Sequence, residues 1–154
     1  FGEVSGRHGA EAQAVGDGVA ARAYLDSSTY RAMQQLRLTV ELQIEPGLHV
    51  YGQPIPDGYV PLSVEVAPLD EVEVGALEAP PPEPFAVAGL DESFHVYAGA
   101  VTVALPLSFG PTNGEKVVQV VVRYQACSAT ECLMPGALRF ELPLTYLPHV
   151  ERPT

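Results

Sequence analysis

Cys127 and Cys132 are the only cysteines among the 154 residues of the chain, and four residues separate them. A disulfide between them would close a very small ring. The chain-entropy model gives such a ring roughly 2 kcal/mol of stabilisation, below the ~3 kcal/mol of a fifteen-residue loop. The bond would therefore contribute little as a structural staple. A small ring beside a loop is easier for a thiolate to attack and reduce, which favours a redox-active pair.

The two cysteines follow a strongly apolar segment at residues 116–125 and precede Pro135. Cys127 is expected at the end of a strand and Cys132 at the start of a loop. One sulfur would then face the strand and the other the solvent. A reactive disulfide needs an accessible sulfur, a thiolate that leaves readily and shielding from unwanted reductants.

The spacing alone leaves three interpretations open, which are a redox pair, a structural staple and half of a metal site. The metal site would need two further ligands, for which His49 and His95 are the best candidates. No Cys-x-x-Cys motif occurs in the chain, so the pair is not of the thioredoxin type. Two cysteines alone fit either an oxidising or a reducing compartment.

Composition narrows the class of protein. Hydrophobic residues make up 47% of the chain and charged residues 18%, as in a globular domain. The net charge of −11 and the scattered basic residues argue against binding to nucleic acid or to an anionic membrane surface. No apolar run reaches the ~20 residues of a membrane helix. The chain begins at Phe1 with neither an initiator Met nor a secretory signal, so we expect a processed form or a part of a longer protein.

Alternation of apolar and polar residues predicts strands in most of the chain. It is clearest in residues 36–44, where every second residue is apolar. About seven short strands are predicted, with turn signals every 8–12 residues, a pattern typical of an antiparallel β-sandwich. An immunoglobulin domain proper would have two distant cysteines and a Trp between them, and this chain has neither. We therefore predict an all-β, immunoglobulin-like antiparallel β-sandwich. Its strands are expected at residues 36–44, 48–51, 61–66, 72–77, 99–107, 116–125 and 138–144.

Three segments are expected along the chain. Residues 1–34 are rich in Gly, Ala and polar residues without clear periodicity, so they are predicted to be a partly disordered or loosely packed lead-in or linker. A short helix around residues 30–35 is the alternative for the end of this segment. Residues 35–146 would form the sandwich, and residues 147–154 a C-terminal tail. The prolines at 80, 81, 82 and 84 restrict their segment to an extended loop or an edge.

Several motifs resemble the amino-terminal domain of the thiol:disulfide interchange protein DsbD, the disulfide bond corrector family. The most specific is Tyr124-Gln-Ala-Cys127, followed by Cys132-Leu-Met-Pro135 and an apolar strand. Glu45-Pro-Gly-Leu-His-Val-Tyr51 resembles the family's Gly-aromatic-x-x-Tyr strand, and Tyr97 precedes another matching strand. The resemblance covers about residues 35–146.

This resemblance implies an immunoglobulin-like domain that passes electrons by thiol–disulfide exchange between thioredoxin-like partners. Cys132 would be the sulfur attacked in mixed-disulfide formation, and Cys127 the resolving partner. The implied location is periplasmic or otherwise extracytoplasmic, with no cofactor and no metal. The partners would be thioredoxin-like or peroxiredoxin-like domains, and the full-length protein could be fused to a membrane carrier or a redoxin domain. No insertion of this domain into a membrane is expected.

The same resemblance implies the residues that line the site: His49, Tyr51, Asp91, Glu92, Phe94, Tyr97 and Tyr124. A carboxylate of Asp91 or Glu92 would raise the pKa of a nearby thiol or relay a proton, whereas a protonated His49 would lower it. Phe94 would cap the disulfide.

Each of these residues also has a structural interpretation. The acidic pair can be a solvated loop, His49 can face solvent, and the aromatic residues can belong to the core. The alternative function is a non-catalytic immunoglobulin-like binding module with a structural hairpin disulfide.

Overall fold

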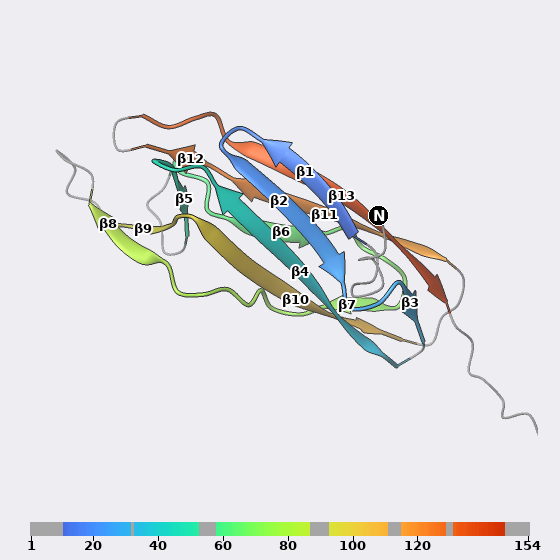
Figure 1. Cartoon of the computed structure of the whole chain (residues 1–154). Helices are drawn as coiled ribbons and strands as arrows, with labels where there is room; N and C mark the ends of the chain where they lie inside the picture. Colours follow the sequence, from blue (N-terminus) through green and yellow to red (C-terminus); the bar gives the residue numbers. More distant parts are fainter. Residues whose placement is uncertain are drawn as a thin grey trace, which may run out of the picture.

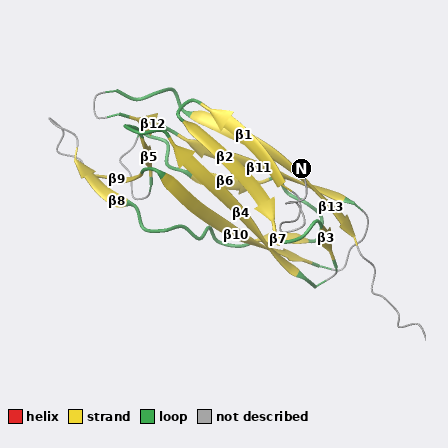
Figure 2. Cartoon of the chain, viewed as in Figure 1, coloured by secondary structure: helices red, strands yellow, loops and turns green. Residues whose placement is uncertain are grey.

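The computed structural model describes residues 11–31, 33–52, 58–86, 93–110, 115–128 and 131–146. All regular elements in these ranges are β-strands (Figure 2). The all-β, immunoglobulin-like antiparallel sandwich predicted from the sequence is thus confirmed. No helix in these ranges has the length and apolarity needed to cross a membrane.

Two sheets face each other across the main core (Figure 1). The five-stranded sheet has the order β1-β2-β4-β10-β7, and its strands are Glu11–Gly16, Val19–Leu25, Gln35–Ile44, Ala100–Phe109 and Val72–Val74. The four-stranded sheet has the order β3-β13-β11-β6, with strands Thr29–Tyr30, Gly136–Tyr146, Lys116–Tyr124 and Ser63–Val66. Their pairs are antiparallel except that of β13 with the short β3.

A small third sheet covers one end of the sandwich (Figure 1). Its order is β12-β5-β9-β8, and its strands are Ala126–Cys127, His49–Tyr51, Ser93–Tyr97 and Glu83–Ala86. The proline-rich segment supplies β8, which lies at the edge of this sheet. Pro84 has no backbone N–H to donate, and an edge strand tolerates this loss where a central strand would not. Cys127 belongs to this third sheet as the last residue of β12.

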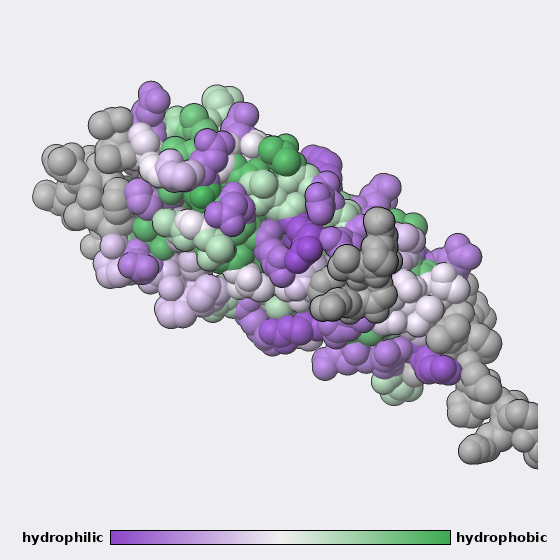
Figure 3. All heavy atoms as spheres, in the orientation of Figure 1, coloured by the Kyte–Doolittle hydropathy of each residue, from purple (hydrophilic) through white to green (hydrophobic). Residues whose placement is uncertain are grey.

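The main core follows from the alternation of the long strands. In β4, Leu36, Leu38, Val40, Leu42 and Ile44 are all buried, as the period-two pattern predicts. The opposite sheet contributes the alternate valines of β11 and the alternate apolar residues of β13 to the same core. The outer face over β1, β2 and β4 is hydrophilic in its middle, and hydrophobic atoms gather toward the end that holds β12 (Figure 3).

The structure differs from the sequence expectation before residue 35. Strands β1, β2 and β3 lie in the segment expected to be a lead-in, and no helix forms at Tyr30, whose ring is buried against Phe109. In β2 the residues alternate between buried and half-buried along its whole length. Two of the buried positions are Ala21 and Ala23, whose small side chains give a weak hydrophobic signal in the sequence. The expected C-terminal tail and residues 1–10 lie outside the described ranges.

Candidate functional site

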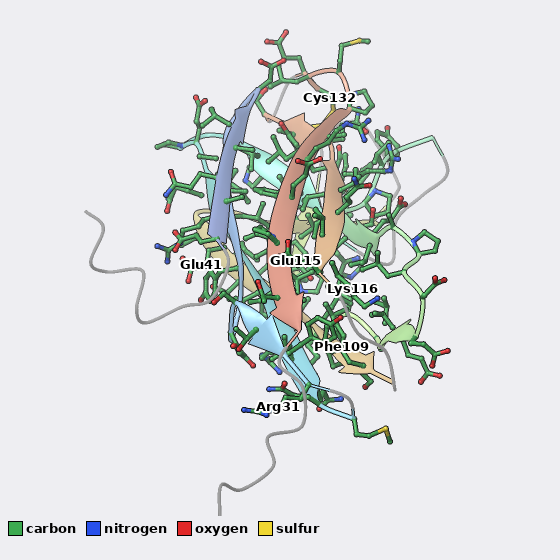
Figure 4. All side chains as sticks on the ribbon, turned by 90° about the vertical axis from the view of Figure 1, so that its right-hand side faces the viewer. Arg31, Glu41, Phe109, Glu115, Lys116 and Cys132 are labelled. Carbon is green, nitrogen blue, oxygen red and sulfur yellow. A yellow bond between two sulfur atoms is a disulfide. The ribbon has the colours of Figure 1, made fainter. Side chains whose placement is uncertain are left out.

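Cys127 and Cys132 form a disulfide with an S–S distance of 2.02 Å at the end of the molecule that carries the third sheet (Figure 4). Figure 4 also shows Arg31 and Phe109 toward the opposite end. Cys127 is the last residue of β12 and pairs on one side with His49 of β5. On its other side it forms an isolated antiparallel bridge with Cys132. The disulfide therefore links two facing backbone segments.

The two cysteines differ in exposure. Cys127 is 4% exposed and packs in a small hydrophobic cluster, whereas Cys132 is an exposed residue. A thiolate from another protein can attack only a sulfur that it can reach. On this ground Cys132 is the accessible member of the pair and Cys127 the protected one.

Three aromatic rings lie beside the disulfide, and we call Tyr51, Tyr59 and Phe94 the aromatic cluster. Tyr51 stacks on Phe94 with ring centroids 5.3 Å apart. Tyr59 meets both rings edge-on, each at 5.2 Å. Phe94 is 1% exposed, so it forms the interior of this cluster. Such ring pairs add about 0.5–1.5 kcal/mol beyond their buried area, and they fix the rings relative to one another.

The hydroxyl of Tyr51 lies 3.6 Å from Sγ of Cys132, within hydrogen-bonding range for sulfur. Burial raises the pKa of Tyr51, and the neighbouring Tyr59 adds to this increase. The phenol therefore keeps its proton at neutral pH and can donate it in a hydrogen bond. A donor at this position stabilises a sulfur more strongly when the sulfur carries negative charge.

Gln125 joins the two loops that meet at the site. Its side-chain oxygen accepts a hydrogen bond from the backbone N–H of Val60, at 3.1 Å. Its side-chain nitrogen donates to the carbonyl of Leu133, at 3.4 Å. Val60 follows Tyr59 and Leu133 follows Cys132, so one side chain fixes the spacing between the aromatic cluster and the accessible cysteine.

The model of the family described as thiol:disulfide interchange protein DsbD, N-terminal, matches residues 20–144. The chain belongs to this family. The resemblance seen in the sequence is thereby confirmed, and the match extends further toward the N-terminus than the motifs do. It begins within β2, in agreement with the place of that strand in the five-stranded sheet.

Solved structures share the fold of this DsbD-type domain. The N-terminal periplasmic domain of ScsB from Proteus mirabilis is 17% identical with a TM-score of 0.59, over 88% of this chain and 51% of that one. The DsbD N-terminal domain of Neisseria meningitidis in the reduced form is 17% identical with a TM-score of 0.49, over 90% and 86% of the two chains. The GAE domain of GGA2p from Saccharomyces cerevisiae is 9% identical with a TM-score of 0.51, over 87% and 98%.

The two similarities with TM-scores above 0.5 establish the fold alone, because proteins with different names share it. The chain spans about half the length of the ScsB structure that it matches. None of the curated proteins compared with the chain matches it. The assignment to the DsbD N-terminal family therefore rests on the family model.

The structure brings some of the expected lining residues of the DsbD-type site to the disulfide. Tyr51 and Phe94 are in the aromatic cluster, and Cys127 packs with them. His49 is half-buried and lies opposite Cys127 in the pairing of β5 with β12. Asp91 and Glu92 lie outside the described residues. In the described part of the chain, no three His, Cys, Asp or Glu residues are grouped to hold a metal ion.

Tyr97 and Tyr124 make their contacts elsewhere. Tyr97 donates a hydrogen bond from its hydroxyl to the carbonyl of Pro80, at 2.8 Å, and so anchors the proline-rich segment. Tyr124 is 2% exposed and belongs to the main core. Its hydroxyl donates to the carbonyl of Asp17 in the turn between β1 and β2, at 3.3 Å. Burial raises the pKa of both phenols.

Two residues of the site are absent from the sequence expectation. No motif marks Tyr59, because its ring contacts depend on the folded arrangement of three separate segments. Gln125 is part of the Tyr-Gln-x-Cys motif, so the sequence did carry a signal for it. Its role as a link between loops follows only from its hydrogen bonds.

Proposed function

We propose that this domain passes electrons between thioredoxin-like partners through the Cys127–Cys132 disulfide. The observation that carries the proposal is the pairing of an exposed Cys132 with a buried Cys127 beside the Tyr51 hydroxyl. Membership of a thiol:disulfide interchange family supports the same chemistry. It also supports an extracytoplasmic location, and the proposed compartment is the periplasm.

The electron transfer consists of two exchange steps. A thiolate of a reduced partner attacks Sγ of Cys132, the Cys127–Cys132 bond breaks, and Cys127 leaves as a thiolate that takes up a proton. The partner's second thiolate then attacks its own sulfur in the mixed disulfide, and Cys132 leaves as a thiolate. Two electrons have moved to this domain, and the partner holds a disulfide. The same steps in reverse reduce the next partner.

Tyr51 has a specific part in this scheme. When Cys132 carries negative charge, the Tyr51 hydroxyl donates a hydrogen bond to it and favours the thiolate. The aromatic cluster holds that hydroxyl in place and covers Cys127 from one side. Phe94 acts here as the interior of the cluster, since only 1% of it is exposed. His49, opposite Cys127, is placed to influence the leaving thiolate.

The partners follow from the chemistry of the exchange. A dithiol with an accessible nucleophilic cysteine is needed to reduce the domain, and a disulfide or oxidised thiol is needed to reoxidise it. Thioredoxin-like and peroxiredoxin-like domains supply these groups. Either could be a separate protein or part of the same full-length chain, together with a membrane carrier.

Mixed-disulfide trapping tests the proposal. Cys127→Ser removes the resolving sulfur. The Cys132 thiolate should therefore displace thionitrobenzoate from a thioredoxin-like protein that lacks its second cysteine and carries this group on the remaining one, and the mixed disulfide should accumulate. Cys132→Ser should give no such adduct, because the remaining Cys127 is buried. Non-reducing electrophoresis and mass spectrometry distinguish the two variants. Equal trapping by both would contradict the proposed roles.

A redox titration separates this function from that of a binding module with a structural staple. A staple is expected below about −300 mV, where the glutathione pool cannot reduce it. We expect a potential above that value for the oxidised domain equilibrated with dithiothreitol mixtures. A potential far below it would favour the structural role.

A further inference from the structure

Ser128 and Glu131, which follow Cys127 and precede Cys132, are hydrogen-bonded to each other. The backbone N–H of Ser128 donates to the carbonyl of Glu131, at 2.8 Å. The Ser128 hydroxyl donates to the same carbonyl, at 3.2 Å, and its oxygen accepts the backbone N–H of Glu131, at 3.1 Å. In a regular hairpin, the N–H of Glu131 would donate to the backbone carbonyl of Ser128. Here the Ser128 side-chain oxygen takes the place of that carbonyl as the acceptor.

Hydrogen bonds continue on the other side of the disulfide. The N–H of Leu133 donates to the carbonyl of Ala126, at 2.9 Å. Cys127 and Cys132 thus occupy a non-hydrogen-bonded pair between two bonded ones, the positions at which facing residues of an antiparallel pair come closest. None of these hydrogen bonds involves a sulfur atom. The backbone hydrogen bonds and those of the Ser128 hydroxyl can therefore keep the cysteines facing each other without the disulfide.

We propose that Ser128 is a positioning residue that keeps Cys127 opposite Cys132 while the disulfide is open. This inference rests on the proposed exchange function. Without the serine hydroxyl, the N–H of Glu131 loses its acceptor, and the carbonyl of Glu131 loses one of its two donors. Only the bond from the Ser128 backbone N–H to that carbonyl then remains of the three. The two sulfurs would then spend less time within reach of each other.

The step that depends on this arrangement is resolution of the mixed disulfide. With Cys132 bound to a partner sulfur, the Cys127 thiolate attacks Sγ of Cys132. The Cys127–Cys132 bond forms, the bond from Cys132 to the partner breaks, and the partner sulfur leaves as a thiolate. The domain is oxidised and the partner reduced by the two electrons of the dithiol. Holding the attacking sulfur in place raises its effective concentration.

Oxidised glutathione is a suitable probe because it reacts with the reduced domain in two separable steps. Cys132 first forms a mixed disulfide and releases one glutathione thiolate, and Cys127 then releases the second. Acid quenching followed by mass spectrometry measures the mixed disulfide over time. Ser128→Ala should form it at the wild-type rate within about twofold but resolve it about fivefold more slowly, the effect of losing about 1 kcal/mol of hydrogen bonding.

Two further variants complete the experiment. Ser128→Thr keeps a hydroxyl and should restore resolution to near the wild-type rate. Ser108→Ala removes a serine whose hydroxyl accepts a hydrogen bond from Gln35 in the paired strands β10 and β4, so it should change neither step. Ser108→Ala is therefore the matched control, because it removes a serine hydroxyl that takes no part in the hydrogen bonds between Ser128 and Glu131.

The outcomes separate this inference from the proposed function. If Ser128→Ala resolves the mixed disulfide as fast as wild type, or slows both steps equally, the positioning role is overturned. If the wild-type domain neither forms the mixed disulfide nor closes to its own disulfide, the exchange function itself fails. Slower resolution with unchanged formation supports both.

Discussion

The main core and the disulfide end each contain a buried tyrosine, but the hydroxyl groups of the two tyrosines have different partners. Tyr124 is 2% exposed and Tyr51 is 4% exposed, so their burial is nearly the same. Tyr124 donates its hydroxyl to the backbone of the β1–β2 turn, whereas the Tyr51 hydroxyl lies beside a sulfur. The first phenol connects two structural elements, and the second is available to a reacting atom.

The strands around the two tyrosines differ as well. Tyr124 ends β11, which pairs with β13 over nine residues and packs aliphatic side chains against β4 and β10. Tyr51 ends β5, a strand of three residues whose pairs with β9 and β12 are two residues long each. Stability therefore resides in the long ladders, while the site is built from short strands and aromatic contacts.

Because the long ladders and the site are separate, the site can bind a partner and exchange its disulfide while the sandwich stays folded. Short strands and loops open at lower free energy than long central ladders do. The Gln125 side chain and the aromatic cluster then compensate locally by fixing the loops around Cys132. The two regions should respond differently to substitution.

Leu38→Ala should have the largest effect on stability and almost none on exchange. Leu38 is fully buried in β4, between Leu25 and Leu105 of the neighbouring strands. Its truncation leaves a cavity and should lower the free energy of unfolding by about 2–5 kcal/mol. Urea unfolding of the oxidised protein measures this loss.

The matched control is Leu77→Ala, since Leu77 is 37% exposed and should lose much less stability. Under conditions in which both variants are folded, the reaction of Cys132 with oxidised glutathione should stay within about twofold of wild type. A large change in that rate for Leu38→Ala would show that the main core and the disulfide end are coupled.

The sequence predicted the main core better than the site, for a physical reason. Alternation in β4 is strong because large apolar residues face the core and mostly polar ones lie between them, so the pattern is visible in the residues themselves. In β2 the inward residues include two alanines, and the strand is specified by its pairing with β4. Tertiary pairing of this sort leaves little trace in a single segment.

The site shows the same limit. Cys127, Cys132 and Tyr51 stand in recognisable motifs, and the structure brings them together. Tyr59 joins them through ring contacts with residues from other segments, which no local pattern encodes. Tyr124 carries an equally good motif position, yet its hydroxyl points to Asp17. Sequence identifies candidate residues, but the direction of each side chain is set by packing.

Paired removal of hydroxyl groups tests the comparison of the two tyrosines directly. Tyr51→Phe should slow alkylation of Cys132 by iodoacetamide in the reduced protein about threefold to tenfold at pH 7, because the thiolate loses a hydrogen-bond donor. Tyr124→Phe should leave that rate within about twofold of wild type. Each variant serves as the control for the other.

Tyr124→Phe should instead lower the free energy of unfolding by about 1 kcal/mol, since the carbonyl of Asp17 loses its donor. Mass spectrometry of the alkylated peptides reports the site of reaction, and urea unfolding reports the stability. Equal slowing of alkylation in both variants would contradict a special role for Tyr51.

The smallest expected effect is a loss of stability at alkaline pH. Burial raises the pKa of Tyr51, with Tyr59 adding to it, and burial raises that of Tyr124, with the charge of Asp17 adding to it. The unfolded phenols ionise near pH 10 while the folded ones keep their protons. The unfolded state then binds fewer protons, so stability is fully present below about pH 10 and falls as the pH rises through the folded pKa values.

Melting temperatures of the oxidised protein between pH 8 and pH 11 measure this slope. Tyr51→Phe and Tyr124→Phe should each make it shallower, because each removes one of the phenols that hold a proton in the folded state. The two residues belong to separate hydrophobic clusters, so their effects should add in the double variant. Effects that fall short of the sum would mean that the aromatic cluster and the main core open together, and the division between a stable sandwich and an independent site would no longer hold.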